Sequence, residues 1–159
     1  MLTQATGNAA CALAYLAAIG GGPELVKDIA EACEVPAPYL AKTIHLLARA
    51  GFVSTQRGIG GGVRLIRDPE TITLFELCEV LGDPAILPRC ILGAAECSDA
   101  RACPAHEFNV QQRERRLQFL RTMTVSKLAA FESKRRWEGA ASGARAALDE
   151  SSQSRTRAV

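Results

Sequence analysis

The clearest capacity for chemistry in this sequence lies in three cysteines and one histidine that fall within one short segment. They are Cys90, Cys97, Cys103 and His106, and the residues between them are mostly small or polar. This segment carries no apolar period of a helix or a strand, so it is predicted to be a loop. Because such a loop gains little from burying side chains, another interaction must offset the entropy of ordering it. Thiolates together with an imidazole suit an iron–sulphur cluster or zinc, so the segment predicts a metal centre; a loop with solvated side chains is the alternative.

The spacing within the loop distinguishes the two kinds of metal. Structural zinc is usually held by short pairs of cysteines, whereas the spacing here is Cys90-x6-Cys97-x5-Cys103-x2-His106. Wide spacings favour a bulky iron–sulphur cluster over a single zinc ion. Pro104 suits the first position of a helix, which would make Cys103 the cap and place His106 in the first turn. Cys103 and His106, three residues apart, would then face one centre.

Length and composition indicate one compact, mainly helical domain with an added arm or tail. The chain has 159 residues, of which 48% are hydrophobic and 5% aromatic, a mixture that favours aliphatic helix packing. With a net charge of only +2, a nucleic-acid partner would have to be contacted through a local basic patch. The start of the chain lacks the features of a signal peptide, and no apolar run is long enough to span a bilayer. We therefore expect a cytoplasmic protein with reduced or metal-bound cysteines and no membrane partner.

Apolar periodicity predicts helices over residues 9–19, 24–33, 38–50, 74–81 and 106–123. In the second of these, Leu25, Ile29 and Cys33 form one apolar stripe. The outward face of the third helix is polar and cationic, and consists of Tyr39, Lys42, His45 and Arg49. Two short helices around a tight break, the second with such a face, are typical of a helix-turn-helix; a helical hairpin with a solvated face is the alternative. Cys33 and Cys78 are interpreted as core residues.

A β-hairpin follows the third helix directly. Its alternating strands and the glycine-rich turn between them cover residues 52–57, 58–62 and 63–67. A hairpin in this position is the wing of a winged helix. Arg57 and Arg64 flank its narrow tip, which includes Gly60, and have the charge and shape to enter a DNA minor groove. Arg67 extends this basic rim.

Beyond the cysteine loop, a long charged helix carries a narrow apolar seam. Its members are Val110, Leu117, Leu120 and Met123. A narrow seam on a long helix needs a partner, and in a symmetric DNA-binding dimer that partner would be the same helix of a second chain. The alternative is that the helix packs on its own domain.

The predicted fold is mainly α with a small β-hairpin wing. It consists of a winged helix-turn-helix DNA-binding domain (1–84), a cluster-binding loop (85–106), a dimerisation helix with a short following helix (107–131), and a polar tail (132–159). The tail is rich in alanine, serine, glycine and arginine, a composition that predicts disorder.

The order of these elements resembles the IscR/NsrR-type family of bacterial iron–sulphur-cluster transcription regulators. The resemblance rests on the wing Arg57-Gly58-Ile59-Gly60-Gly61-Gly62 joined to the three-cysteine loop and the long helix, and it covers about residues 2–131. Leu2-Thr3 before an alanine-rich helix, Tyr39-Leu40 and Ala50-Gly51-Phe52-Val53 are also similar to the family pattern.

The resemblance implies a homodimer whose recognition helices read adjacent major grooves of a pseudo-palindromic DNA operator. It also implies an iron–sulphur cluster that senses redox state, nitric oxide or iron supply and changes DNA affinity. The sequence does not decide the cluster type, and we favour 2Fe–2S over 4Fe–4S. By position, the implied ligands are Cys90, Cys97, Cys103 and His106. The candidate DNA contacts are Tyr39, Lys42, His45, Arg57, Gly60 and Arg64. No enzymatic role is expected, because no catalytic dyad, substrate pocket or cofactor loop is legible.

Three positions depart from the family pattern. The first cysteine spacing is six residues, where five is commoner. Gly7-Asn8 stands where nitric-oxide-sensing members place an acidic ligand, which favours His106 as the fourth ligand here. Ala41 occupies a position that carries a glutamate in IscR-type members, which affects the operator sequence that is read. The alternatives that stay open are a winged-helix regulator using zinc or free thiols, and one whose signal is a partner enzyme or a small ligand.

Overall fold

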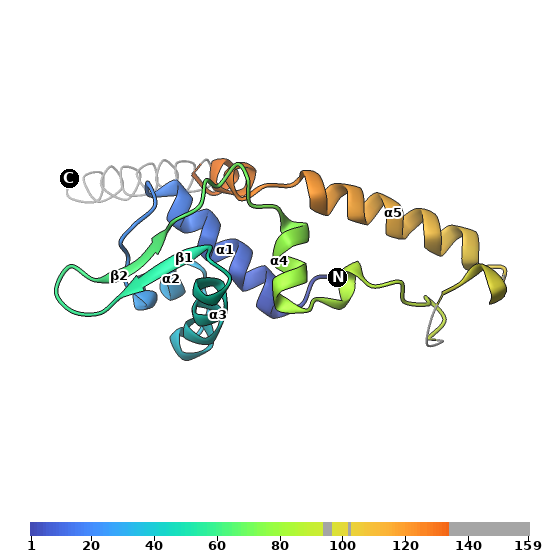
Figure 1. Cartoon of the computed structure of the whole chain (residues 1–159), viewed down its shortest axis with the longest axis horizontal. Coiled ribbons are helices and arrows are strands. Elements are labelled where there is room, and N and C mark those ends of the chain that lie inside the picture. Colours follow the sequence, from blue (N-terminus) through green and yellow to red (C-terminus); the bar gives the residue numbers. More distant parts are fainter. Residues whose placement is uncertain (94–96, 102, 134–159) are drawn as a thin grey trace, which may run out of the picture.

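Helices and one hairpin follow one another in the predicted order. The computed structural model describes residues 1–93, 97–101 and 103–133 of the 159-residue chain. Its elements are α1 (Gln4–Ala18), α2 (Val26–Ala32), α3 (Ala37–Arg49), β1 (Val53–Gln56), β2 (Gly62–Leu65), α4 (Leu74–Leu81), η1 (Pro84–Ile86), η2 (Asp99–Arg101) and α5 (His106–Thr122). Residues 125–133 are also helical. The mainly α fold with a small β-hairpin is therefore confirmed (Figure 1). None of the helices in these described ranges has the length and apolar character needed to cross a membrane.

Helix α1 begins at Gln4, earlier than the predicted residue 9, because its N-terminus has a side-chain cap. The hydroxyl of Thr3 accepts a hydrogen bond from the Thr6 N–H at 3.3 Å. Thr6 and Asn8 are poor helix formers, yet both are buried. Capping and burial therefore extend the helix beyond the alanine-rich run.

Helix α2 begins later than predicted because the residues before it pair with the hairpin. Glu24 donates its N–H to the Val63 carbonyl at 3.0 Å and accepts from the Val63 N–H at 2.7 Å. Gly22 allows this close approach, since a Cβ at that position would lie 2.5 Å from the Val63 carbonyl oxygen. Leu25, predicted to face inward, is the N-cap and is 55% exposed. Of the predicted stripe, Ile29 is the fully buried member.

Helix α3 and the hairpin form close to where the sequence predicts them. The buried apolar side chains of α3 include Leu40, Ile44 and Leu47. Gly51, with a φ of 77°, takes the left-handed conformation that follows the end of a helix. The antiparallel register of β1 and β2 runs from Val53↔Leu65 to Gln56↔Gly62. Both paired strands are shorter than the predicted ones.

Helix α4 matches its prediction at both ends. The hydroxyl of Thr73 accepts a hydrogen bond from the Glu76 N–H at 3.2 Å, and Gly82, with a φ of 64°, ends the helix. Cys78 is fully buried, which confirms it as a core residue. Burial, with smaller contributions from the charges of Asp83 and Glu79, raises the pKa of its thiol to about 11. The Cys78 thiol therefore stays protonated at neutral pH and has little reactivity.

The C-terminal half of α5 packs on its own domain. Leu117 and Leu120 are buried, and α5 lies against α4. The chain then returns to the core, where Val125 is fully buried and donates its N–H to the Ile72 carbonyl at 2.9 Å. This half of the apolar seam therefore packs on its own domain, as the alternative interpretation has it. Val110, in the other half, is 44% exposed.

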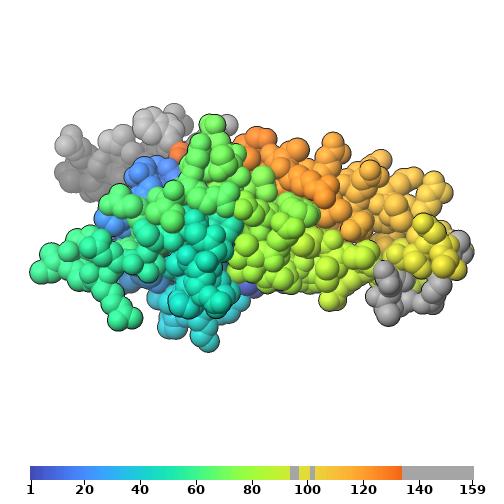
Figure 2. Space-filling view, in the orientation of Figure 1, coloured from blue at the N-terminus to red at the C-terminus, as the bar shows by residue number. Residues whose placement is uncertain are grey.

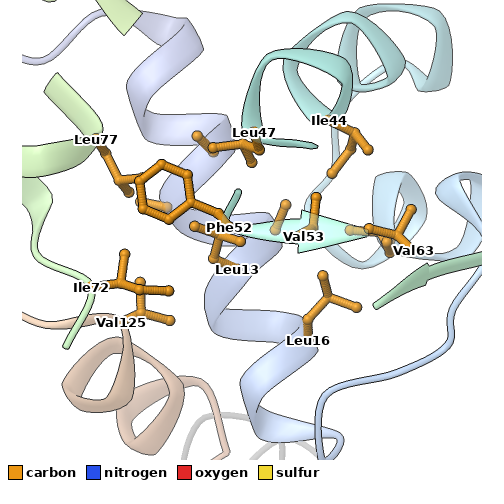
Figure 3. Packing of buried hydrophobic residues seen from close by; sticks show 14 of the residues in the cluster. Leu13, Leu16, Ile44, Leu47, Phe52, Val53, Val63, Ile72, Leu77 and Val125 are labelled. Carbon is orange, nitrogen blue, oxygen red and sulfur yellow. The ribbon is translucent and has the colours of Figure 1, made fainter. Parts of the chain in front are cut away.

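One hydrophobic core joins all these elements. It includes buried side chains from each of the helices α1 to α5 and from both strands. Figure 3 shows the ring of Phe52 among Leu13 of α1, Leu47 of α3 and Leu77 of α4, with Val125 close by. The winged helix and the segment after α5 are therefore parts of the same packed unit.

Asp83 ties the start of the chain to the end of α4. Its carboxylate accepts hydrogen bonds from the Thr3 N–H at 2.8 Å, the Thr3 hydroxyl at 2.9 Å and the Ala85 N–H at 2.8 Å. Burial by itself would raise the pKa of this carboxyl group. The hydrogen bonds from Thr6, Ala85 and Thr3 outweigh that effect and lower the pKa of Asp83 below its ordinary value.

We expect Asp83→Ala to lower the free energy of unfolding by about 3 kcal/mol at neutral pH, because charge-assisted hydrogen bonds are lost in a buried place. Asp83→Asn keeps one carbonyl acceptor and is expected to cost less. Because the folded-state pKa is depressed, the stability from ionised Asp83 is complete above its unfolded pKa of about 4 and is lost as the pH falls through the folded-state pKa. The difference between wild type and Asp83→Asn in urea denaturation should shrink below that pH; a constant difference would contradict the role.

Candidate metal centre and nucleic-acid interface

The cysteine loop and the wing lie at opposite ends of the molecule. The loop joins η1 to α5 and lies at the far end from the hairpin tip, in yellow in both views (Figures 1 and 2). The Cys97 N–H donates to the Pro88 carbonyl at 3.3 Å, and the side chain of Asn109 in α5 donates to the Arg89 carbonyl at 2.9 Å. The described part of the loop is therefore held against the first turns of α5.

His106 is the first residue of α5, which agrees with the predicted helix over 106–123, but the predicted cap is wrong. The N-cap is Ala105, not Cys103, and Pro104 lies in a turn before the helix. The His106 N–H donates to the Cys103 carbonyl at 2.9 Å and closes this turn. The Asn109 N–H then donates to the Ala105 carbonyl at 3.0 Å, and this four-residue bond sets the start of the α-helix.

The structure brings two of the four predicted ligands together. The Sγ atom of Cys97 lies 3.3 Å from Nδ1 of His106. On the other side of the ring, Nε2 of His106 lies 2.8 Å from Oδ1 of Asp99. The His106 side chain is largely buried, with 16% of its surface exposed. The imidazole is therefore held between a thiol and a carboxylate.

Cys90 and Cys103 are half-buried and do not complete the set around this pair. Among the described residues, no three His, Cys, Asp or Glu side chains converge in a way that would hold a metal ion. The donor set nevertheless fits an iron–sulphur cluster, because three thiols and an imidazole in one loop match the ligands that such clusters take. The contact between Cys97 and His106 also shows that this loop can bring a sulphur and a ring nitrogen to one point.

A hollow of about 340 Å³ opens beside Cys90, between the loop and α5. The cationic side chains of Arg89 and Arg116 line it together with the apolar Ile91 and Phe108. Arg116 is fixed in place, since its Nε donates to the Ala85 carbonyl at 3.0 Å. Positive charge beside apolar walls is suited to a small anionic molecule.

The predicted DNA contacts of α3 lie on its exposed face. Tyr39, Lys42 and His45 are all exposed, opposite the buried side chains of the same helix. No acidic residue lies within α3, so this face is cationic. It is therefore available to a large polyanionic partner.

The wing projects from the molecule at the other end from the loop (Figure 2). Arg57 and Arg64 are exposed, as predicted for groove-entering side chains. Gly60, with a φ of 76°, supplies a backbone conformation that other residues rarely adopt at the tip. Arg67 does not extend the basic rim, which corrects the prediction. Its guanidinium donates to both carboxylate oxygens of Glu76 and lies over the ring of Phe52, 4.9 Å from its centroid.

Sequence reasoning missed the polar partners of these sites. Asp99, which contacts His106, is one of several charged residues in the loop region, and its spacing carries no distinguishing signal. Asn109 anchors the loop from one turn into α5, and Glu76 neutralises Arg67 from a different element.

One face of α5 presents an uncovered surface. A hollow of about 720 Å³ runs along it and is lined by Val110, Arg113, Glu114, Leu117, Gln118, Arg121 and Thr122. Phe108 and Phe119 are 55% and 51% exposed on the same helix. Two exposed phenylalanines on one helix indicate a surface that a partner covers.

Comparisons with known proteins agree with this geometry. Residues 2–130 match the Rrf2 family, described as an iron-dependent transcriptional regulator. A putative HTH-type transcriptional regulator of Aquifex aeolicus is 31% identical over 125 residues, which cover 77% of this chain and 87% of that protein. The HTH-type transcriptional regulator IscR of Klebsiella pneumoniae strain 342 is 30% identical over 107 residues, which cover 67% of this chain and 65% of that protein.

A solved structure shares the fold at lower sequence identity. CymR, the global cysteine regulator of Bacillus subtilis, superposes with a TM-score of 0.69 at 24% identity, covering 82% of this chain and 97% of CymR. Nearly the whole length of that protein therefore has a counterpart in this chain.

Proposed function

This chain belongs to the Rrf2 family of transcriptional regulators, and we propose that an iron–sulphur cluster held by Cys90, Cys97, Cys103 and His106 controls its affinity for a DNA operator. It is a DNA-binding transcriptional regulator and not an enzyme, as the sequence predicts. The observation that carries the proposed cluster is the contact of Cys97 Sγ with His106 Nδ1 at 3.3 Å inside a three-cysteine loop. Because its partner is DNA, we place the protein in the cytoplasm.

The conformation of the loop affects the position of α5. When bound, the cluster supplies a centre that responds to redox state, nitric oxide or iron supply, and we favour 2Fe–2S over 4Fe–4S. His106 is both a proposed ligand and the first residue of α5, and Asn109 holds the loop backbone from within that helix. The path of the loop therefore sets the position of the first turns of α5.

A homodimer formed through α5 would convert this local change into a change in DNA affinity. The hollow lined by Val110, Arg113 and Arg121 is the uncovered face of α5 that a second copy would cover. In a symmetric dimer, the two α3 helices must lie about 34 Å apart to enter adjacent major grooves of a pseudo-palindromic operator. A change in the α5 contact would alter this spacing for both half-sites at once.

We assign the two DNA-contacting elements to different grooves of the duplex. We assign Tyr39, Lys42 and His45 on α3 to the major groove, because a helix with a cationic exposed face fits its width. Arg57 and Arg64 on the wing are assigned to the minor groove, with Gly60 keeping the tip narrow. Exposure and charge of these side chains support the assignment.

The test is a comparison of operator binding with and without the cluster. The protein is purified without oxygen, its iron, sulphide and zinc are measured, and its absorption and Mössbauer spectra are recorded. Operator affinity is then measured before and after the cluster is removed by a chelator. Iron and sulphide together with a change in affinity support the proposal. A colourless, iron-free protein that still responds to its signal in cells refutes the cluster and leaves the DNA-binding function intact.

A second candidate signal is a small anionic molecule that binds the hollow beside Cys90. The charges of Arg89 and Arg116 favour it, and CymR, which shares the fold, is described as a cysteine regulator. Zinc or free thiols in the loop, or a partner enzyme, are further alternatives to the cluster. A variant with all three loop cysteines replaced separates these cases, because regulation by a small molecule or a partner enzyme would survive in it.

We expect Arg57→Ala to weaken operator binding by about tenfold, or about 1.4 kcal/mol, because a minor-groove cation is lost. Gel-shift titration at a fixed salt concentration measures the change. Arg115→Ala is the matched control, since Arg115 is an exposed arginine on α5, far from the wing. Equal affinities of Arg57→Ala and wild type would reject a role of the wing in DNA binding.

A further inference from the structure

The hydrogen bonds around His106 indicate which ring nitrogen has a lone pair that could bind a metal. A neutral imidazole has one N–H donor and one acceptor nitrogen, whereas an ionised carboxylate only accepts. Nε2 of His106 lies 2.8 Å from Oδ1 of Asp99, so this nitrogen carries the proton and donates. In the neutral ring, Nδ1, which faces Cys97 Sγ at 3.3 Å, is then the nitrogen with the lone pair.

We propose that Asp99 is a positioning residue that fixes the tautomer and ring orientation of His106, so that Nδ1 is the atom offered to the metal centre. This inference rests on the proposed cluster. Metal-binding histidines commonly donate their second N–H to a carboxylate, which orients the ring and makes the ligand more basic. Here the carboxylate comes from η2, within the same loop as the three cysteines. The residue proposed to orient the histidine ligand therefore belongs to the same loop as the cysteine ligands.

The burial of the two side chains defines how Asp99 acts. The Asp99 side chain is fully exposed, while the His106 ring has 16% of its surface exposed. An exposed carboxylate gains little stability from one hydrogen bond, because water competes for it. Asp99 is therefore expected to affect the orientation of the ring and the retention of the cluster, with little effect on folding.

The tautomer can be measured directly in the metal-free full-length protein. The chain contains two histidines, His45 and His106, so long-range proton–nitrogen correlation spectra are simple to assign. At a pH of about 8.5, where an ordinary histidine is neutral, His106 is expected to be protonated on Nε2, while exposed His45 shows the average of both tautomers. Asp99→Ala should move the His106 signals toward that average. A proton on Nδ1 in the wild type, or unchanged signals in Asp99→Ala, would overturn the inference.

The ligating atom can be identified in the protein that contains the cluster. Histidine labelled with nitrogen-15 at only Nδ1 or only Nε2 is incorporated, the cluster is reduced, and pulsed electron paramagnetic resonance detects which nitrogen is strongly coupled. Strong coupling at Nδ1 supports the inference, and strong coupling at Nε2 overturns it. A protein without iron defeats the proposed function instead, and the tautomer measurement then still decides the role of Asp99.

Matched variants separate the hydrogen bond from charge. Asp99→Ala is expected to lose its cluster to a chelator about tenfold faster than wild type. Asp99→Asn keeps a carbonyl acceptor for Nε2–H and should lie between the two. Glu107→Ala removes a carboxylate next to His106 on the first turn of α5 and should behave as wild type. Equal acceleration in Glu107→Ala would mean that charge alone acts, and would overturn the positioning role.

Discussion

Replacing Cys97 with alanine is expected to leave the anaerobically purified protein with less than about a tenth of the wild-type iron and without its visible absorption. Cys97 is the proposed ligand whose sulphur already meets the ring of His106, at 3.3 Å. A cluster cannot be retained on the remaining thiols without a replacement ligand at this point. Iron analysis and the absorption spectrum measure the loss, and gel-shift titration measures the accompanying change in operator affinity.

Cys33→Ala is the matched control for this experiment. Cys33 is also a half-buried cysteine, but it lies at the end of α2, in the winged helix. Its replacement should leave the iron content and the spectrum unchanged. If Cys97→Ala keeps both its iron and its wild-type operator affinity, the loop is not the switch.

Phe52→Ala is expected to lower the free energy of unfolding by about 4 kcal/mol, because a large buried ring is removed from a core that can close only partly around the cavity. Phe52 is fully buried where α1, α3 and α4 meet, and its ring also supports the guanidinium of Arg67. Urea denaturation at neutral pH measures the loss. Since single domains of this size are stabilised by about 5–15 kcal/mol in total, the variant should be close to unfolding at physiological temperature.

Ile59→Ala provides the control, in the hairpin that directly follows Phe52. Ile59 is a large aliphatic side chain that is fully exposed at the wing tip, so its truncation should change stability by no more than about 0.5 kcal/mol. A cost below about 1 kcal/mol for Phe52→Ala would mean that the core tolerates the cavity and that its packing is looser than Figure 3 indicates.

The parts of the fold that local chemistry determines could be predicted from the sequence. Thr73 and Gly82 bound α4 as predicted, because a side-chain cap and a left-handed glycine act within one turn of the chain. The buried face of α3 follows directly from helical periodicity. The wing could also be predicted, since its glycines separate two segments in which apolar and polar residues alternate.

Long-range contacts explain most of what the sequence did not reveal. Glu24 lies outside α2 because its backbone pairs with Val63, which is distant in the sequence. Arg67 is removed from the basic rim by Glu76, and no periodicity relates these two positions. The apolar seam of α5 is likewise divided: Leu120 packs in the core of its own domain, whereas Val110 lies on an uncovered surface.

The candidate site was predictable in its donors but not in its geometry. The spacing of the cysteines and His106 predicts a metal-binding loop, but the loop has no periodicity from which side-chain directions follow. The pairing of Cys97 with His106, and of His106 with Asp99, depends on how the backbone bends before α5. The predicted tail falls outside the described residues beyond 133, and its first two residues continue the preceding helix.

The return of the chain to the core after α5 has a practical consequence for anyone who wishes to work with the DNA-binding half alone. Val125 and Leu120 are encoded beyond the cysteine loop, yet they are buried in the same cluster as Ile72 and Leu77. An expression fragment that stops at residue 84 would lack Val125 and Leu120 and would leave Ile72 and Leu77 exposed to water. A shortened protein that binds DNA must therefore retain Leu120 and the segment that contains Val125, so a linker can replace only the cysteine loop and the first turns of α5.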